Sequence, residues 1–353
     1  MKEKNCFIEA EEKTVEWEKQ LFVERQETVT VLPPKAGLPS GLDKYLNDGI
    51  LHQPLIRRKS CLTNDWAHIN MARAERPMGS MNLQMKQSEC VFCKGNEDKT
   101  PRCVTTGGDY MRVGESSWTL RVFPNLYPWL INHLNIVQTS DHKISFSELD
   151  EKEEFEAWCV AAKLAGEIEQ QGSFPMLFRN HGWGSSIAHF HWQVGALPYI
   201  PNHIQEEMTV SKAFRDKWDI NIFDALIKAE KAKGLRWIGE DEHTAVIAAF
   251  APRTAFETWL ICKAPITSIS QCSSDQLSSL CTNLNTLLQR LYSQHNIDTM
   301  NIIFHQLPAT KDHSHYRLHI EIMPFKHLGG AERGFGEYAI EVTPESVAAS
   351  LRA

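Results

Sequence analysis

Two histidines and a glutamine alternate along a short apolar segment near the middle of the chain. They are His189, His191 and Gln193, in residues 188–196, which we predict to form a β-strand. Because alternate side chains of a strand share one face, the spacing predicts that all three point the same way. A neutral imidazole can attack phosphorus, and a neighbouring amide can donate to a phosphoryl oxygen as charge builds up. The triplet therefore suggests covalent chemistry at a phosphate group.

Cys90 and Cys93 form a C-x-x-C pair, whereas the other seven of the nine cysteines are scattered. An odd number of cysteines in a long chain without an export signal argues against a disulfide framework. Thiolates at this spacing, with two histidines later in the chain, suit tetrahedral zinc. A loop that holds no metal is the alternative interpretation of this pair.

The composition describes an ordinary globular protein of 353 residues, with 42% hydrophobic and 23% charged residues. The formal net charge of -7 gives no general attraction for nucleic acid or acidic membranes. The N-terminus lacks the apolar core of a signal peptide, and no apolar run is long enough to span a bilayer. We therefore expect a cytoplasmic protein with no nucleic-acid and no membrane partner.

One pattern of strands and a long helix occurs twice, which indicates an internal duplication. The first copy comprises strand, strand, helix, strand and strand at residues 119–124, 133–138, 147–171, 174–179 and 188–196. The second repeats this order at residues 244–250, 258–263, 274–295, 300–305 and 316–323. In the first helix, Ser147 and Asp150 form a workable capping arrangement.

The duplication predicts an α+β fold of two tandem repeats, each an antiparallel sheet packed with a long helix. We divide the chain into an N-terminal extension (1–64), a first, catalytic repeat (65–200), a linker (201–240) and a second repeat (241–353). The extension is expected to be helical at first and then a loop-rich arm.

The last strands of the two copies differ at the residues that could do chemistry. His189 aligns with His319, but His191 aligns with Glu321 and Gln193 with Met323. The second copy thus keeps one imidazole and lacks both the candidate nucleophile and its amide partner. We expect one catalytic centre per chain.

Seven short motifs follow one another in the order known from one family. They are D-W with R-x-x-R-P (65–77), C-x-x-C-x-G-N (90–96), R-V-x-P-N-x-x-P (121–128), D-H (141–142), N-x-G (180–182), H-x-H-x-Q (189–193) and K-x-x-x-G-x-E (326–332). In these motifs the chain resembles the histidine-triad superfamily and, within it, the galactose-1-phosphate uridylyltransferase family. The resemblance covers roughly residues 65–350.

The resemblance implies a nucleotidyltransferase acting on a nucleotide-sugar and a hexose 1-phosphate. His191 would attack the α-phosphorus and form a covalent nucleotidyl-histidine, and Gln193 would donate to a non-bridging oxygen. The residues expected to bind nucleotide or phosphate are Arg73, Arg76, Asn125, Asn180, Ser186, Lys326 and Glu332. In that family the two arginines tend to serve the neighbouring subunit, which implies a homodimer. A solvated surface pair is the alternative for them.

The resemblance also implies metal sites. The positions that match the family's zinc ligands are Cys90, Cys93, His142 and His189. A possible second metal, iron or a second zinc, would be held by Glu207, His305, His319 and Glu321. Two imidazoles and two carboxylates fit either metal. A hydrogen-bonded polar cluster without metal is the alternative for the second group.

Two departures from the family pattern keep other functions open. Phe190 stands where the family usually has proline, and the loop between Asn180 and His189 is about two residues short. These changes are compatible with a phosphorylase that resolves the same adduct with inorganic phosphate, acting on a nucleotide-sugar or a dinucleoside polyphosphate. A non-catalytic nucleotide-binding protein is the second alternative, although His191 and Gln193 are both present.

Overall fold

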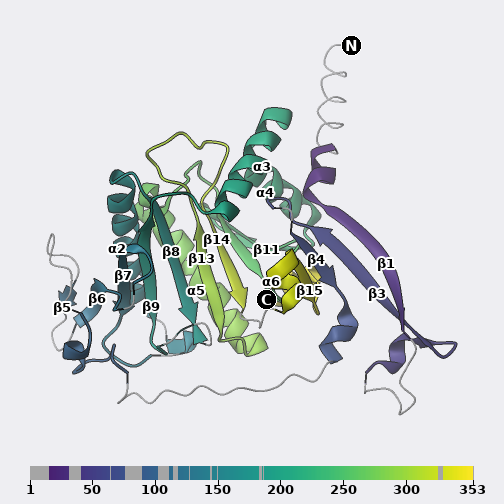
Figure 1. The fold of residues 1–353 in the computed structure, drawn as a ribbon, viewed down its shortest axis with the longest axis horizontal. Helices are drawn as coiled ribbons and strands as arrows, with labels where there is room; N and C mark the ends of the chain where they lie inside the picture. The colour runs from purple at the N-terminus through teal and green to yellow at the C-terminus, as the bar shows by residue number, and fades with distance from the viewer. Residues whose placement is uncertain are drawn as a thin grey trace.

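The computed structural model describes residues 16–31, 41–63, 65–75, 90–101, 111–113, 118–126, 128–143, 145–148, 150–182, 185, 187–324 and 329–352 (Figure 1). Ten strands form a large sheet: β5 (Met111–Val113), β6 (Trp118–Pro124), β7 (Ile131–Gln138), β8 (Phe174–His181), β9 (His191–Leu197), β10 (Trp237–Glu240), β11 (Thr244–Ala248), β12 (Thr258–Cys262), β13 (Met300–His305) and β14 (His319–Pro324). A smaller sheet contains β1 (Val23–Val31), β2 (Leu46–Asn47), β3 (Ile50–Lys59), β4 (Trp66–Ile69) and β15 (Glu337–Ile340). Among the described residues, 16–21 are helical, and the later α-helices are α2 (Glu151–Gln170), α3 (Asn202–Trp218), α4 (Ile222–Lys233), α5 (Ser274–His295), α6 (Gly330–Phe335) and α7 (Pro344–Leu351). The predicted α+β class is confirmed.

The two predicted repeats share one continuous sheet, so the expectation of two separate sheets is wrong. The strand order is β10-β11-β12-β14-β13-β8-β9-β7-β6-β5, and the halves meet where β13 pairs antiparallel with β8. At this junction Ile303 lies opposite Phe178, and Asn301 lies opposite Asn180. The pairing satisfies the backbone groups that each repeat alone would leave open at its edge.

Helices α2 and α5 cover one face of the large sheet and contact each other. Trp192 on β9 and Ile320 on β14 point into the core on this side. Helices α3 and α4 belong to a second core that includes Phe214, Phe223 and Trp259. Because strand side chains alternate, a residue next to Trp192 or Ile320 faces away from α2 and α5.

Several element boundaries differ from the prediction. Helix α2 begins at Glu151, because the Asp150 carboxylate caps it by accepting from the N–H groups of Lys152 and Glu153, both at 3.0 Å. Ser147 lies instead in a short 3-10 helix, Phe146–Glu148. Helix α5 and strand β13 have the predicted bounds.

The two segments placed outside the repeats are regular structure. Residues 201–240, predicted to be a linker, form α3, α4 and β10, and β10 is one of the two edge strands of the large sheet. Strands β1 and β3 of the N-terminal extension pair along nine residues, and β3 also pairs with β4. The expected loop-rich arm is therefore a sheet, whose last strand, β15, comes from the C-terminal region. None of the described helices is long and apolar enough to cross a membrane.

Candidate functional site

Strand β9 begins at His191, so His189 precedes the strand and the predicted strand 188–196 starts too early. The His191 Nδ1–H donates to the backbone carbonyl of His189 at 2.7 Å. This bond fixes the tautomer and leaves the lone pair on Nε2. Burial lowers the pKa of His191 to about 4, so the ring is neutral at ordinary pH. A buried, oriented and neutral imidazole has the properties of a nucleophile.

The aromatic residues on either side of His191 hold it in place. Phe190 and Trp192 are both buried, and the Arg179 guanidinium lies 4.5 Å and 5.2 Å from their ring centroids. Arg179 in turn forms a fully buried ion pair with Glu154 of α2, at 3.0 Å. These contacts anchor the start of β9 on the helix side of the sheet. The His191 side chain consequently faces the opposite side.

Gln193 lies two residues further on the face of His191. Its Oε1 accepts from Nε2–H of His133 on β7, at 3.0 Å. Asn135 lies directly opposite Gln193 on β7, and its Oδ1 accepts from Asn125 Nδ2 at 3.3 Å. The sequence reasoning missed His133 and Asn135. Their alternate positions in the predicted strand 133–138 were the available signal.

The predicted nucleotide- and phosphate-binding residues have different outcomes. Asn180 is half-buried on β8 near the start of β9, and Asn125 directly follows β6. Glu332 caps its own helix α6, accepting from the Gly329 N–H at 2.9 Å. Arg73 lies in a short 3-10 helix, Met71–Glu75, but its side chain is not described. Arg76, Ser186 and Lys326 lie outside the described residues.

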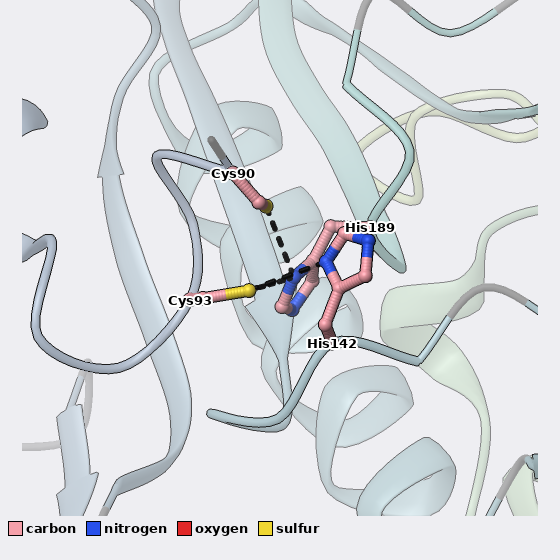
Figure 2. Close-up of side chains that lie close together, drawn as sticks. All are labelled: Cys90, Cys93, His142 and His189. Atoms are coloured by element: carbon pink, nitrogen blue, oxygen red, sulfur yellow. Dashed lines mark hydrogen bonds between the residues drawn. The ribbon is translucent and has the colours of Figure 1, made fainter. Parts of the chain in front are cut away.

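The first predicted metal group comes together beside the start of β9. Figure 2 shows the side chains of Cys90, Cys93, His142 and His189 converging on one point. Cys93 Sγ lies 3.2 Å from His142 Nδ1 and 3.6 Å from His189 Nδ1, and Cys90 Sγ lies 3.5 Å from His189 Nδ1. A tetrahedral zinc with bonds of 2.0–2.3 Å separates its ligands by about 3.5 Å, so the spacing suits zinc.

The surroundings of His189 also suit a metal ligand. Its Nε2 donates to the backbone carbonyls of Gln138 and Thr139, each at 3.1 Å, which leaves the Nδ1 lone pair toward the sulfurs. Burial lowers the pKa of His189 to about 4 and, together with Cys90, raises that of Cys93 to about 12. A cation is therefore needed to bring the buried thiol to its thiolate form.

The second predicted group, Glu207, His305, His319 and Glu321, is fully buried, with its ligand atoms within 4.8 Å of one another. His305 bridges the carboxylates: Nδ1 lies 2.9 Å from Glu207, and Nε2 lies 2.9 Å from Glu321. Burial lowers the pKa of His305, but the two carboxylates outweigh this effect and raise it to about 10.

His319 gives the second group an open donor atom. Its Nδ1–H donates to the Arg317 carbonyl at 3.1 Å, and its buried Nε2 has no hydrogen-bond partner among the described residues. This arrangement is typical of a histidine that binds metal. Arg253, which the sequence reasoning missed, contacts Glu321 and lies 2.9 Å from Glu257. The residues present thus fit a divalent metal but also carry a cation of their own.

The chain is similar over most of its length to known enzymes and to a solved structure. No protein-family model matches the chain. It is 26% identical to ADP-glucose phosphorylase from Arabidopsis thaliana over 341 residues, covering 86% of this chain and 94% of the relative. It is 24% identical to galactose-1-phosphate uridylyltransferase from Saccharomyces cerevisiae over 343 residues, covering 84% and 93%. The crystal structure of the Arabidopsis phosphorylase with bound ADP-glucose superimposes with a TM-score of 0.72, covering 84% of this chain and 97% of the other.

Proposed function

Because the chain belongs to the histidine-triad superfamily, in its galactose-1-phosphate-uridylyltransferase-like branch, we propose that it is an enzyme that cleaves a nucleotide-sugar through a covalent nucleotidyl-histidine. The observation that carries this proposal is the tautomer of His191. Its Nδ1 proton is held by the His189 carbonyl at 2.7 Å, which leaves a neutral Nε2 to attack. His191 and Gln193 are the proposed catalytic residues.

The reaction takes two displacements at the same phosphorus. Nε2 of His191 attacks the α-phosphorus, the bond to the bridging oxygen breaks, and sugar 1-phosphate leaves with the electron pair. A phosphate oxygen of the acceptor then attacks the nucleotidyl-His191 and restores the neutral imidazole. The Gln193 N–H₂ group donates to a non-bridging oxygen, where negative charge increases in both transition states. Asn125 and Asn180 are proposed to contact the nucleotide and its phosphates.

Two acceptors fit this mechanism. A hexose 1-phosphate gives a new nucleotide-sugar, as the sequence motifs predict. Inorganic phosphate gives a nucleoside diphosphate, and the likeness to a plant ADP-glucose phosphorylase over most of both chains favours this second candidate. ADP-glucose is therefore the first donor to examine.

Zinc is the metal proposed for Cys90, Cys93, His142 and His189, and iron or zinc for the second group. Bound zinc would link the loop carrying the cysteines to the segment that carries His189. The His189 carbonyl accepts from His191, so this link would also support the nucleophile. The homodimer stays a prediction, because the side chains of the two arginines on which it rests are not described.

The test is the covalent adduct itself. Purified protein is mixed separately with ADP-glucose, UDP-glucose, UDP-galactose and GDP-mannose, and its intact mass is recorded without acid. We expect a gain of one nucleoside monophosphate, absent in His191→Ala. Adding inorganic phosphate or galactose 1-phosphate then identifies the acceptor by which of them removes the adduct. A folded, metal-loaded protein that gains no mass from any donor contradicts the proposal.

A further inference from the structure

We infer that His133 is a positioning residue for the catalytic amide of Gln193. The inference rests on the proposed function, because it assigns a role within that site. It starts from a hydrogen bond between β7 and β9, in which His133 Nε2–H donates to Gln193 Oε1 at 3.0 Å. His133 is not one of the residues of the H-x-H-x-Q motif, it is not one of the proposed metal ligands, and it lies in none of the seven motifs.

A β-bulge places His133 at this position. Ile131 pairs with Ala196 and Leu134 pairs with Val194, so two residues of β7, Asn132 and His133, face one residue of β9. Asn132 has a positive φ of 49°, which non-glycine residues seldom adopt. Bulges of this kind redirect side chains and are frequent beside active sites.

The residue opposite the bulge is a glycine for a steric reason. A Cβ on Gly195 would lie 2.6 Å from Leu130 Cβ and 3.3 Å from His133 Cα. The close approach of the two strands thus depends on Gly195. The left-handed backbone of Asn132 and the glycine opposite it both belong to the bulge, and the bulge brings His133 into contact with Gln193.

The protonation state of His133 follows from its partner. Oε1 of Gln193 can only accept, so His133 must carry its proton on Nε2. Burial lowers the pKa of His133 more than the bond to Gln193 raises it, and the ring is therefore neutral. The Trp129 ring packs edge-on against it, with centroids 5.9 Å apart. His133 is thus held as a neutral donor of fixed direction.

The bond decides which end of the Gln193 amide is presented to the substrate. With Oε1 held by His133, the amide N–H₂ group is directed away from β7 and can donate to a phosphoryl oxygen. Without His133, the amide can turn over and present its carbonyl oxygen, which repels the phosphate. Removing one preorganised donor from such a site lowers the rate by about 10²–10³-fold. Misorienting the donor should have a smaller effect, and we expect a rate about 10–100-fold lower.

The experiment compares single-turnover formation of the nucleotidyl adduct in His133→Phe, His133→Gln and wild type. We expect His133→Phe to slow the step about 10–100-fold at saturating donor, with little change in donor affinity. His133→Gln restores an N–H donor at a similar distance from the backbone and should recover most of the rate. His295→Phe is the matched control, since His295 also forms one bond through Nε2, to Ser350 Oγ at 2.9 Å, and also packs on an aromatic ring.

A double-mutant cycle separates positioning from general support of the fold. If His133 acts through Gln193, His133→Phe should cost nothing further in a Gln193→Leu background. Additive losses, no rescue by His133→Gln, or an unchanged rate in His133→Phe would each overturn the inference while the proposed function stands. A wild-type protein that forms no adduct would refute the proposed function, and this inference with it.

Discussion

The two candidate metal groups are built from different chemistry. Cys90 and Cys93 face two imidazoles, and the structure describes no cation or carboxylate among the four. Glu207 and Glu321 of the second group are bridged by His305, and Glu321 also contacts Arg253. The first group therefore has no charge of its own to stabilise ionised thiols, whereas the second supplies its own counter-ions.

Because of this difference, a metal would have a different structural role in each group. At the first group the metal would create the interaction that holds the loop to the strand. At the second group, ion pairs and the bond from Tyr316 to Glu207, at 2.5 Å, already connect α3, β13 and β14. We expect tight, structural metal binding at the first group and weaker binding at the second.

Cys93→Ser should have the largest effect. It removes a zinc ligand, and structural zinc contributes on the order of 10 kcal/mol in small domains, so we expect a destabilisation of more than about 5 kcal/mol. Metal analysis should show the loss of one zinc per chain, and thermal unfolding should show the lower stability. The half-buried Cys272→Ser is the matched control. A Cys93→Ser protein with undiminished zinc would remove the basis of the comparison.

Glu207→Gln should cause the second largest loss of stability, and this loss should occur even when no metal is bound. Glu207 is fully buried and accepts hydrogen bonds from both His305 and Tyr316. In Glu207→Gln, an amide nitrogen replaces one carboxylate oxygen and cannot accept a hydrogen bond. Breaking a buried ion pair costs about 3–5 kcal/mol. Urea unfolding of the metal-free protein measures this loss of stability. Before the metal is removed, Glu207→Gln and wild type should contain the same amount of zinc at the first group. Asp216→Asn, on the exposed face of the same helix, should cost less than about 0.5 kcal/mol.

Arg253→Met should increase the metal affinity of the second group, because it removes the guanidinium that pairs with the carboxylates there. The buried carboxylates of Glu257 and Glu321 then lose their shared partner, so a divalent metal gains more by binding. We expect added Zn²⁺ or Fe²⁺ to bind about tenfold tighter, which is about 1.4 kcal/mol of extra stabilisation. The shift in melting temperature with metal measures it, and the exposed Arg215→Met is the control. Equal shifts in Arg253→Met and wild type would mean that Arg253 does not compete with a metal.

Local pattern and motif order allowed much of this site to be predicted. The ligand sets of both metal groups were predicted from the family resemblance, although Cys90 and His189 are 99 positions apart. Helix α5 was predicted at its observed bounds because its leucines recur at helical spacing, which is a local signal. The structure adds a capping box at its start, Ser273 with Gln276.

What the sequence did not reveal depends on contacts between distant strands. The shared sheet arises from the pairing of β8 with β13, which no periodicity reports. His133 reaches Gln193 because of a bulge, and a bulge is set by the register between two strands. Arg253 reaches Glu321 from a loop 68 positions earlier in the chain. Each of these contacts is set by tertiary structure. The alternation of His133 and Asn135 along strand 133–138 indicated only that the two side chains share a face.

A third ionic cluster provides a reference that contains no histidine. Arg58 and Arg236 are buried and share Glu345, at 3.0 Å and 2.8 Å, and Arg236 also pairs with Glu230 at 2.8 Å. Glu24 of β1 pairs with Arg58 at 2.9 Å. The cluster links the small sheet to α4 and α7. Its two guanidinium groups pair with three carboxylates, and it therefore tests how buried ion pairs behave in a cluster without imidazoles.

Glu345→Gln should cost about 1–3 kcal/mol at neutral pH, because two charge-assisted bonds are weakened. Burial raises the pKa of Glu345, but the bonds and charges of Arg58 and Arg236 outweigh it and lower the pKa below 4.5. A carboxylate with a depressed pKa stabilises the fold fully above its unfolded pKa and loses that contribution as pH falls through its folded pKa. The difference in unfolding free energy between wild type and Glu345→Gln should therefore be constant near neutrality and shrink below about pH 4. Urea unfolding across this range measures it, and a difference that grew on acidification would show that the ion pairs do not stabilise the cluster.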